Sequence, residues 1–547
     1  MKWQYLSDEI PQSFDEVKTL LAKNRNITNL ENFFFLKHPS ELALEACGLN
    51  VAELQTAHDR LAEAKKTGET VVIFGDYDAD GITASAIVWL ALKEYGIVAK
   101  PFIPLRDKHG YGLSVGALEE VIETHNPSLI VTVDNGIVAH EAADFLVAQN
   151  IDLILTDHHQ PEELLPTATA VVHSTQLCGA SVGWMLIRDL VKTEFANSLL
   201  DLAGIATIAD QVPLFHANRS FARYGIEALR TTQRRGIISL LKAAGSLQAE
   251  VDSTTVGFVL APRINAMGRL AHGMDALRLL CSNNPQQVAE LTEVLTSTNS
   301  ERQELTRELY DLAIQQAKEQ EDQHMLVISS DQFHEGIIGL LAGRLVEKFS
   351  KPAIVLAVSE HTAKASVRSV PGVHITNYLR NFKDRMTSLG GHPMAAGFGV
   401  ELIKLEKLIT DIQTAALTEI SKEMLEATLT IEFQIPAELV SLDLVDVLDS
   451  FAPFGSGNDY PVFAIHEVKL LTAKTMGKDG SHLLLTVQLH EDAPALKVIG
   501  WRQAFRVPKL EVGKSYTLVG VIEKNVWKNR ASLQMVIMGV SESTTTD

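Results

Sequence analysis

The chain has 547 residues and a formal net charge of −20 at pH 7, with 46% hydrophobic and 21% charged residues. Such a length exceeds a single hydrophobic core, so two to four domains are expected, and the acidic balance argues against a generic nucleic-acid coat while leaving room for a local basic groove. No apolar run reaches the ~20 residues that cross a bilayer, no secretory signal opens the sequence, and the three cysteines form neither a disulfide nor a zinc spacing, so we expect a cytoplasmic protein that does not enter a membrane.

The first half of the chain alternates short apolar runs with helical stretches. Residues 1–65 form a polar segment that we expect to be helical. Residues 66–284 then carry four apolar runs, at 71–74, 129–133, 153–156 and 168–172. This β–α–β rhythm predicts an α/β domain built on a doubly wound, mostly parallel sheet.

Three further parts follow along the chain. Residues 285–323 have apolar residues at helical spacing, which predicts one long connecting helix or a helix pair. Residues 324–424 begin a new strand–helix alternation, which predicts a second, smaller α/β domain. Residues 425–541 change to short alternating strands with turn signals, which predicts a small closed or partly open barrel, and residues 542–547 form a tail.

Three carboxylates follow the first buried strand. Asp76, Asp78 and Asp80 alternate directly after the apolar run at 71–74, and Gly81 closes the turn. Ligands of open α/β sheets bind at the carboxyl ends of the strands. Carboxylates this crowded repel one another unless cations hold them, so the run predicts a metal site. A solvated Asp/Gly-rich turn is the alternative unless partners follow other strands.

Polar side chains also follow the later apolar runs. Asp134 comes after the second run, His158 and His159 follow the third, and Asp210 comes after the apolar residues 204–209. Parallel strands share one carboxyl edge, so we expect these side chains to meet there. A mixture of carboxylates and imidazole suits Mn²⁺ first, with Mg²⁺ as the alternative, and is large enough for two ions that share one carboxylate.

The segments GDYDADG, VDNG and TDHH, in this order, resemble the DHH phosphoesterase superfamily. The wider pattern is similar to its RecJ branch, the single-strand-specific 5′→3′ exonucleases. That pattern consists of eight further segments: Arg106–Ser114, Leu177–Gly183, Ile208–Leu214, Ala261–Leu270, Glu335–Gly343, Ser366–Ser369, Gly390–His392 and Pro453–Phe463. The resemblance spans about residues 45–540 of the chain.

The resemblance implies a two-ion hydrolase, in which the ions make water nucleophilic near neutral pH. The implied metal ligands are Asp78, Asp80, Asp134, His158 and Asp210, with Asp134 bridging the two ions.

The resemblance also implies three catalytic residues. Asp76 would be a further ligand or a support for the ligands. His159 would face the scissile phosphate and orient or protonate groups there. His392 would come from the second domain and stabilise negative charge in the transition state.

Six motif residues are implied to hold the strand. Arg106, Ser366 and Arg368 suit a terminal 5′-phosphate, because guanidinium forks and a hydroxyl group bind phosphate oxygens. The second set would contact phosphates or brace the cleft, and it consists of Arg263, Asn265 and Arg269.

Aromatic residues are the candidates for base stacking. Tyr111 would stack on a base or pack against the protein. Trp501 and Trp527 lie in a basic stretch of the C-terminal barrel, which resembles an OB-fold, and aromatic rings among cations suit a single strand.

Two positions depart from related patterns. Phe74 stands where the pyrophosphatase branch carries a metal-binding histidine, which counts against a pyrophosphatase. His173 and Ser174 stand where RecJ proteins usually carry Asn-Pro, and the role of this pair stays open.

We therefore expect a metal-dependent exonuclease that removes nucleoside 5′-monophosphates from the 5′ end of single-stranded DNA, in DNA recombination and repair. We expect a monomer whose further partners are a single-strand-binding protein and a helicase. Two alternatives stay open. A DHH phosphodiesterase for short oligoribonucleotides or cyclic dinucleotides would lack the barrel, and a catalytically silent scaffold would have eroded ligands.

Overall fold

The computed structural model describes residues 2–110, 112–491, 493–527 and 530–542. Tyr111 lies outside these residues, and so does the side chain of Trp527. The chain divides into two compact units. The barrel unit consists of Met1–Lys37, Pro213–Arg219 and Thr428–Asp547, and the two-sheet unit consists of His38–Val212 and Ser220–Ala427. The finer domain boundaries predicted from the sequence stay predictions.

The first sheet of the two-sheet unit has five strands, all parallel, in the order β3-β2-β4-β5-β6. The strands are β2 (Val71–Phe74), β3 (Ala99–Phe102), β4 (Leu129–Thr132), β5 (Asp152–Asp157) and β6 (Ala170–His173). Every residue of β2 and β4 is buried. Their continuous apolar sequence is therefore explained by helices that cover both faces of the sheet.

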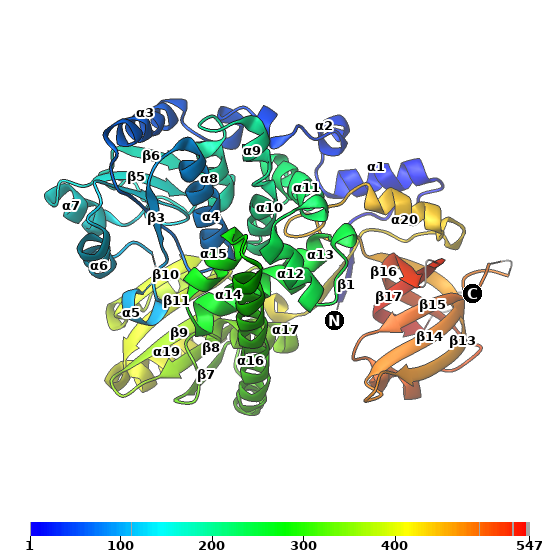
Figure 1. The fold of residues 1–547 in the computed structure, drawn as a ribbon. Coiled ribbons are helices and arrows are strands. Elements are labelled where there is room, and N and C mark those ends of the chain that lie inside the picture. Colours follow the sequence, from blue (N-terminus) through cyan, green and yellow to red (C-terminus); the bar gives the residue numbers. More distant parts are fainter. Residues whose placement is uncertain (1, 111, 492, 528–529, 543–547) are drawn as a thin grey trace. The chain divides into compact units, whose positions relative to one another are not determined.

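Helices lie on both sides of this sheet (Figure 1). The flanking helices are α3 (Val51–Thr67), α4 (Ala79–Tyr95), α6 (Val115–His125), α7 (His140–Ala148) and α8 (Gly179–Ile187). One face packs on α6 and α7 through a core that includes Phe74, Leu118 and Leu146. Helices α4 and α8 pack on each other and on the strands, and they start at the carboxyl edge of the sheet. The predicted doubly wound sheet is confirmed.

A helical layer follows the sheet along the chain. Its members are α9 (Thr193–Asn197), α10 (Leu200–Ala209), α11 (His216–Thr231), α12 (Arg235–Ala243), α13 (Ser253–Thr255), the π-helical turn η4 (Val256–Leu260), α14 (Ala261–Leu270) and α15 (Gly273–Cys281). Helices α10 and α11 touch at their backbones, because a Cβ added to Gly204 would lie 2.6 Å from Gly225 Cα. The apolar residues 204–209 are thus part of a buried helix, which an apolar run alone does not distinguish from a strand.

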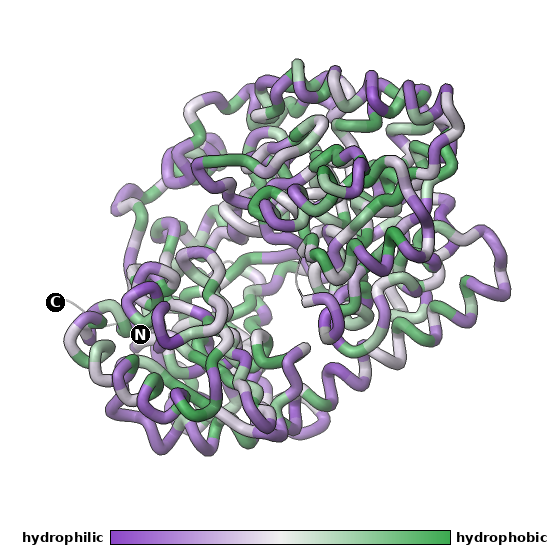
Figure 2. The backbone as a smooth tube through the Cα atoms, turned by 90° about the vertical axis from the view of Figure 1, so that its left-hand side faces the viewer, coloured by the Kyte–Doolittle hydropathy of each residue, from purple (hydrophilic) through white to green (hydrophobic). Residues whose placement is uncertain are grey.

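A single helix, α16 (Pro285–Lys318), connects the two sheets of this unit. The Asn284 side chain accepts hydrogen bonds from two backbone N–H groups of its first turn, and Pro285 occupies the first helical position. Its mean composition is polar. Figure 2 shows the mixture of hydrophilic and hydrophobic residues along the backbone. The predicted connecting helix is confirmed as one helix. No helix within the described ranges is long and apolar enough to cross a membrane.

The second sheet has the order β10-β11-β9-β8-β7, with only β7 and β8 parallel. Its strands are β7 (Leu326–Ser330), β8 (Ala353–Val358), β9 (Thr362–Arg368), β10 (Ser388–His392) and β11 (Ala395–Glu401). The accompanying helices are α17 (Ile338–Phe349), α18 (Ile375–Arg380) and α19 (Leu402–Glu419). Helix α17 packs against α16 on one side of the sheet, and α18 and α19 contribute to the core on the other side. The predicted second α/β domain is confirmed.

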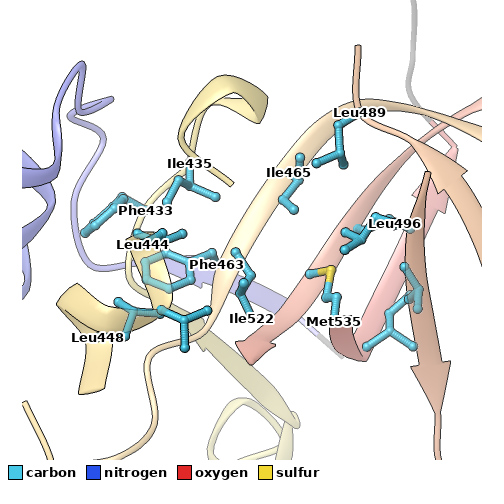
Figure 3. Close-up of a cluster of buried hydrophobic side chains, with 14 of the residues drawn as sticks. Phe433, Ile435, Leu444, Leu448, Phe463, Ile465, Leu489, Leu496, Ile522 and Met535 are labelled. Atoms are coloured by element: carbon cyan, nitrogen blue, oxygen red, sulfur yellow. The ribbon is translucent and has the colours of Figure 1, made fainter. Parts of the chain in front are cut away.

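The barrel unit contains a closed five-stranded barrel with strand order β13-β14-β15-β17-β16. Its strands are β13 (Phe463–Met476), β14 (His482–Gln488), β15 (Leu496–Gly500), β16 (Ser515–Trp527) and β17 (Arg530–Glu542). Alternate residues of these strands point inward, and Figure 3 shows Ile465, Leu496 and Met535 among the side chains that fill the interior. The predicted small barrel is confirmed.

The N-terminal segment 1–65 is divided between the two units, because Met1–Lys37 belongs to the barrel unit and the residues from His38 onward belong to the two-sheet unit. It contains a strand, β1 (Lys2–Tyr5), which pairs in parallel with β12 (Thr428–Ile431). The expectation of a purely helical segment was therefore wrong for these residues. Strand β12 pairs with β1 and lies outside the barrel, although its alternating pattern matches that of the barrel strands. The unit is completed by the helices α1 (Phe14–Asn24), α2 (Leu30–Phe34) and α20 (Leu442–Asp449).

Candidate active site

The predicted ligands gather at the carboxyl edge of the first sheet. Asp76 and Asp80 follow β2, Asp134 follows β4, and His158 follows β5. The three aspartates are between 1% and 2% exposed. Asp210 reaches the same place from the C-terminal end of α10. The prediction that it follows a strand was wrong, because the apolar run before it is a buried helix.

His158 lies among three of the carboxylates. Its Nε2 is 3.1 Å from Asp134 Oδ1 and 3.7 Å from Oδ2 of both Asp80 and Asp210. One ligand atom each from Asp80, His158 and Asp210 lies within 4.8 Å of the others. These atoms can therefore share one cation.

A second group lies beside the first. Asp76, Asp78 and Asp134 each offer an oxygen, and these oxygens also lie within 4.8 Å of one another. Asp134 belongs to a further group with His158 and His159. Among the described residues, Asp134 is the carboxylate that belongs to two of these groups, and its role as a bridging ligand stays a prediction.

Backbone N–H groups hold the carboxylates of the first loop. Asp78 caps helix α4 by accepting a hydrogen bond from Gly81 N at 3.0 Å. The two oxygens of Asp80 accept hydrogen bonds from Gly179 N and Ala180 N, both at 2.7 Å, at the start of α8. The positive end of that helix dipole favours the negative charge of Asp80.

Asp134 has an unusual backbone conformation. Its φ of 63° lies in the left-handed region, which costs a non-glycine residue about 1–2 kcal/mol. A Cβ added to Gly179 would lie 2.5 Å from Asp134 Cβ, so only glycine leaves room for this side chain. The start of α8 therefore shapes the position of two ligands at once.

The buried carboxyl groups resist ionisation. Burial, and then repulsion by neighbouring aspartates, raises the pKa of Asp76 to about 8, that of Asp80 to about 7 and that of Asp210 to about 9. The pKa of Asp134 is raised well above its usual range by burial and then by Asp80. Burial lowers the pKa of His158 to about 4, with a further contribution from His159. The cluster therefore needs cations to be fully charged.

Two buried atoms without hydrogen-bond partners are a second reason to expect divalent cations here. Asp134 Oδ1 and His158 Nε2 are buried and have no hydrogen-bond partner, although they lie 3.1 Å apart. Buried polar atoms without partners are rare in folded proteins. Lone pairs of a carboxylate and a neutral imidazole directed at one place are what Mn²⁺ or Mg²⁺ requires.

His159 is held by an aspartate that the sequence reasoning did not single out. Its Nδ1 lies 2.7 Å from Asp157 Oδ1, and Asp157 also accepts hydrogen bonds from the N–H groups of His158, His159 and Ile137. Burial alone would lower the pKa of His159, but the hydrogen bond and charge of Asp157 outweigh it and raise the pKa to about 9. The place of Asp157 at the head of the Asp-His-His segment is the signal that could have revealed this role.

His392 lies beside His159 as predicted. Their rings are stacked at an angle of 20°, with centroids 6.4 Å apart. Burial and the charge of His159 lower the pKa of His392, so it is the neutral partner of the two. The second sheet thus brings its Gly-rich strand β10 to the candidate site.

His173 and Ser174, whose role the sequence leaves open, each make a hydrogen bond at the end of β6. His173 Nε2 lies 2.7 Å from the carbonyl oxygen of His159, so this ring nitrogen carries the proton that it donates. Ser174 donates to the carbonyl oxygen of Cys47 at 2.5 Å. His173 therefore holds the backbone of His159 by a hydrogen bond, although it stands where RecJ proteins usually carry another residue.

Arginines gather on the side of the site formed by the second sheet. Arg368 donates to Ser366 Oγ at 3.3 Å, and both side chains face Gly339, where an added Cβ would lie 3.1 Å from that oxygen. Burial lowers the pKa of Arg269 to about 10, followed by the charges of Arg106 and other arginines. Neither Arg269 nor Arg368 has a carboxylate within 4.0 Å in the described part of the chain. These cations are consistent with an anion site.

Two further predicted residues have structural contacts. Asn265 accepts a hydrogen bond from Ala79 N at 2.7 Å, so it braces the first loop. Arg263 donates to the carbonyl oxygen of Val259 at 2.8 Å, and its Nε is buried without a partner. Of the two roles predicted for this set, bracing is the one that these contacts favour for Asn265.

Trp501 belongs to the barrel unit, whereas the cluster belongs to the two-sheet unit. Its side chain is 53% exposed and meets His482 edge-on, with ring centroids 5.0 Å apart. An exposed indole can stack on a base, and this role of Trp501 stays a prediction.

Three family models match this chain. A DHH family N-terminal domain matches residues 70–208, a DHHA1 domain matches 322–417, and a RecJ OB domain matches 431–539. A crystal structure of exonuclease RecJ bound to manganese is 30% identical, and the match covers 69% of this chain and 96% of that one, with a TM-score of 0.60. The chain belongs to the RecJ family.

Other RecJ relatives support this assignment. RecJ of Thermus thermophilus, solved in complex with Mn²⁺, has a TM-score of 0.83 at 25% identity, and the match covers 100% of this chain and 80% of that one. The single-stranded-DNA-specific exonuclease RecJ of Bacillus subtilis is 32% identical over 90% of this chain, which spans 63% of that relative's length. The RecJ of Haemophilus influenzae is 29% identical, over 88% of this chain and 90% of that relative.

Proposed function

We propose that this protein is a metal-dependent exonuclease that removes nucleoside 5′-monophosphates from the 5′ end of single-stranded DNA. The observation that carries the proposal is the cluster of candidate ligands around His158 and Asp134, beside arginines that have no carboxylate partner among the described residues. The RecJ relatives of Bacillus subtilis and Haemophilus influenzae are named single-stranded-DNA-specific exonucleases. Both features suit a substrate that carries phosphate at its end.

The chain's own residues divide the chemistry between them. Asp78, Asp80, Asp134, His158 and Asp210 hold two divalent cations, with Mn²⁺ as the expected ion and Mg²⁺ as its substitute. When bound, such a pair activates water and offsets charge on the phosphate that is attacked.

His159 supplies a proton donor next to those ligands. Asp157 keeps it protonated over the neutral pH range, because it raises the pKa of His159 to about 9. A protonated imidazole there can stabilise or protonate phosphate oxygens. His392, neutral and stacked against it, completes the wall of the site.

The end of the strand is selected by a phosphate pocket. Ser366 and Arg368 offer a hydroxyl and a guanidinium fork beside Gly339, near the start of α17. Arg106, whose guanidinium lies 5.5 Å from the centroid of the Tyr77 ring, joins them from the first domain. A pocket that fixes a terminal phosphate makes the enzyme act from the 5′ end.

The barrel guides the strand through its exposed Trp501 and neighbouring cations. We infer a cytoplasmic monomer that works in DNA recombination and repair, with a single-strand-binding protein and a helicase as partners. The filled ligand positions count against a silent scaffold, and the barrel counts against an enzyme for short oligoribonucleotides or cyclic dinucleotides.

The test uses 5′-labelled single-stranded and blunt duplex DNA with Mn²⁺, and an Asp134→Ala variant as the control. Release of labelled mononucleotide from the single strand alone is expected, and the variant should release none. Equal cleavage of both substrates, or activity unchanged by Asp134→Ala, would overturn the proposal.

A further inference from the structure

One motif segment has only part of its sequence explained by the chemistry described so far. It is Arg106–Ser114, of which Arg106 alone enters the proposed function. Its first four residues form α5 (Arg106–His109), a single helical turn between β3 and α6. Leu105 precedes this turn without capping it by a side-chain hydrogen bond, and Gly110 ends it with a φ of 78°. A single turn of helix is not stable by itself, so other contacts have to hold it.

His109 makes a contact through each of its ring nitrogens. Leu105 N donates to Nδ1 at 3.0 Å, and Nε2 lies 3.1 Å from Glu120 Oε2. Because Nδ1 accepts a hydrogen bond, Nε2 carries the proton and donates it to the carboxylate. The side chain is only 4% exposed, and its ring centroid lies 5.8 Å from that of Phe102. The ring therefore satisfies the N–H group before α5 and links the turn to another element.

Glu120 joins this turn to helix α6. Its carboxylate accepts hydrogen bonds from Lys108 Nζ and from His109 Nε2. The hydrogen bond of Lys108, and then that of His109, lowers the pKa of Glu120, so the group is a carboxylate at neutral pH. The helix that carries it is firmly placed, because Leu118 and Val121 are fully buried in the core beside the first sheet.

A second contact ties the same turn to the start of α6. Ser114 Oγ donates to the carbonyl oxygen of His109 at 3.2 Å. As the N-cap of α6, the same oxygen accepts a hydrogen bond from Ala117 N at 3.4 Å. His109 thus holds α5 at both ends, through its ring before the turn and through its carbonyl group after it.

Arg106 starts this turn, and its charge acts on another arginine of the site. Its guanidinium lies 5.5 Å from the centroid of the Tyr77 ring. Burial, and then the charge of Arg106, lowers the pKa of Arg269 to about 10. Like charges repel one another unless an anion lies between them. A loose turn would let Arg106 move away, so a fixed backbone keeps this side chain ready for a phosphate.

We propose that His109 and Glu120 position Arg106 for the terminal phosphate and thereby set the preference for 5′-phosphorylated ends. The inference rests on the proposed function, in which Arg106 belongs to the phosphate pocket. Both residues act through the backbone of α5, so they are positioning residues rather than contacts to the strand. All of these groups belong to the two-sheet unit.

The test compares two single strands that differ only in their 5′ end, a phosphate or a hydroxyl group, with full-length protein and Mn²⁺. The measured quantity is the ratio of kcat/KM for the phosphate end to kcat/KM for the hydroxyl end. His109→Ala should lower this ratio about 5-fold, the scale of one lost hydrogen bond. A ratio at the wild-type value, or equal losses on both ends, would overturn the inference.

Two combinations of variants show whether the effect passes through Arg106. Glu120→Ala should lower the ratio as His109→Ala does, and the double variant should lower it no further, because both changes remove the same contact. In an Arg106→Gln background, His109→Ala should have no additional effect on the ratio. Additive losses in either combination would contradict the inference. If His109→Ala does not fold, Glu120→Ala carries the same prediction and the same outcome against it.

Glu119→Ala is the matched control, because Glu119 is the exposed neighbour of Glu120 on the same helix. It removes the same charge and should keep the wild-type ratio. An equal fall in this variant would trace the effect to the charge of α6 rather than to the contact with His109, and the inference would be wrong.

Failure of the proposed function gives a different result. In that case the wild type and Asp134→Ala would both release no mononucleotide, or the wild type would not distinguish the two ends. Failure of the inference alone leaves the wild-type preference and its loss in Arg106→Gln, with normal ratios in the His109 and Glu120 variants.

Discussion

The imidazole of His159 and the carboxylate of Asp157 share a hydrogen bond of 2.7 Å between Nδ1 and Oδ1. The same oxygen also accepts two backbone N–H groups, and the pKa of Asp157 is lowered although its burial acts in the opposite direction. This buried anion is the reason that His159 can stay protonated beside cations. We therefore propose that His159 acts together with Asp157 rather than as a lone histidine.

Replacing Asp157 by Asn is expected to lower kcat by roughly 10²- to 10⁴-fold at neutral pH. The pKa of His159 is about 9 in the wild type, so its proton is present below that pH and lost above it. Without the negative charge, burial lowers the pKa of His159, and the alkaline limb of the kcat–pH profile should move down by roughly 1–3 pH units. Profiles measured with Mn²⁺ present test this. An unchanged profile would remove His159 from the proton-donor role.

The stability of the metal-free protein should fall as the pH rises from about 5 to about 9. The folded-state pKa values of Asp80, Asp76 and Asp210 are raised to about 7, 8 and 9, above those of the unfolded chain. The folded state therefore holds more protons than the unfolded state in this window, and it loses stability as they leave.

Thermal unfolding at several pH values, with and without Mn²⁺, measures this effect. The stabilisation by Mn²⁺ should be larger at pH 8 than at pH 5, because the ions replace protons on the carboxylates. A metal-free unfolding temperature that rises through this range would contradict the prediction.

Arg368→Gln is expected to reduce the preference for 5′-phosphorylated ends. The ratio of kcat/KM for a 5′-phosphate strand to that for a 5′-hydroxyl strand should fall about 10-fold or more, the scale of one lost charge-assisted hydrogen bond of ~1.5–3 kcal/mol. Arg380→Gln, at an exposed arginine on α18, is the control and should keep the ratio. A ratio that is equal in both variants would place the end-binding site elsewhere.

Asn265→Ala is expected to lower kcat more than the affinity for the strand. The side chain holds Ala79 N, next to Asp78 and Asp80, and loss of this bond should cost about 1 kcal/mol of stability. Steady-state kinetics, binding of a single strand without metal and thermal unfolding together distinguish the two roles. Weaker strand binding with normal kcat would instead make Asn265 a contact to the substrate.

The sequence predicts the sheet, the connecting helix and the ligands best where one physical rule dominates. Residues 71–74 are read correctly because a strand buried on both faces has to be continuously apolar. Asp210 is correctly expected beside the other polar residues but on the wrong kind of element, since its helix is buried on all sides and loses its 3.6-residue pattern. Its role as a ligand stays a prediction. Asp157 was overlooked because its role depends on which N–H groups surround it, and only the folded loop shows that.

The partners in long-range contacts cannot be predicted from local sequence patterns. The alternation in residues 428–431 correctly predicts a strand, but nothing in it identifies residues 2–5 as the neighbour. The contact of Asp80 with the start of α8 cannot be predicted from local sequence either, because Gly179 and Ala180 are about a hundred positions away along the chain. Local patterns determine element types, and tertiary packing determines partners.

The parallel pair of β1 and β12 has a consequence for how the protein is made. Lys2 leaves the ribosome at least twenty seconds before its partner Thr428, at a translation rate of ~20 residues per second. During translation the two-sheet unit can fold while the edge of β1 is still unpaired. The pairing of β1 with β12 has to wait for residues 428–431, so it is one of the non-local contacts that high contact order makes slow to form.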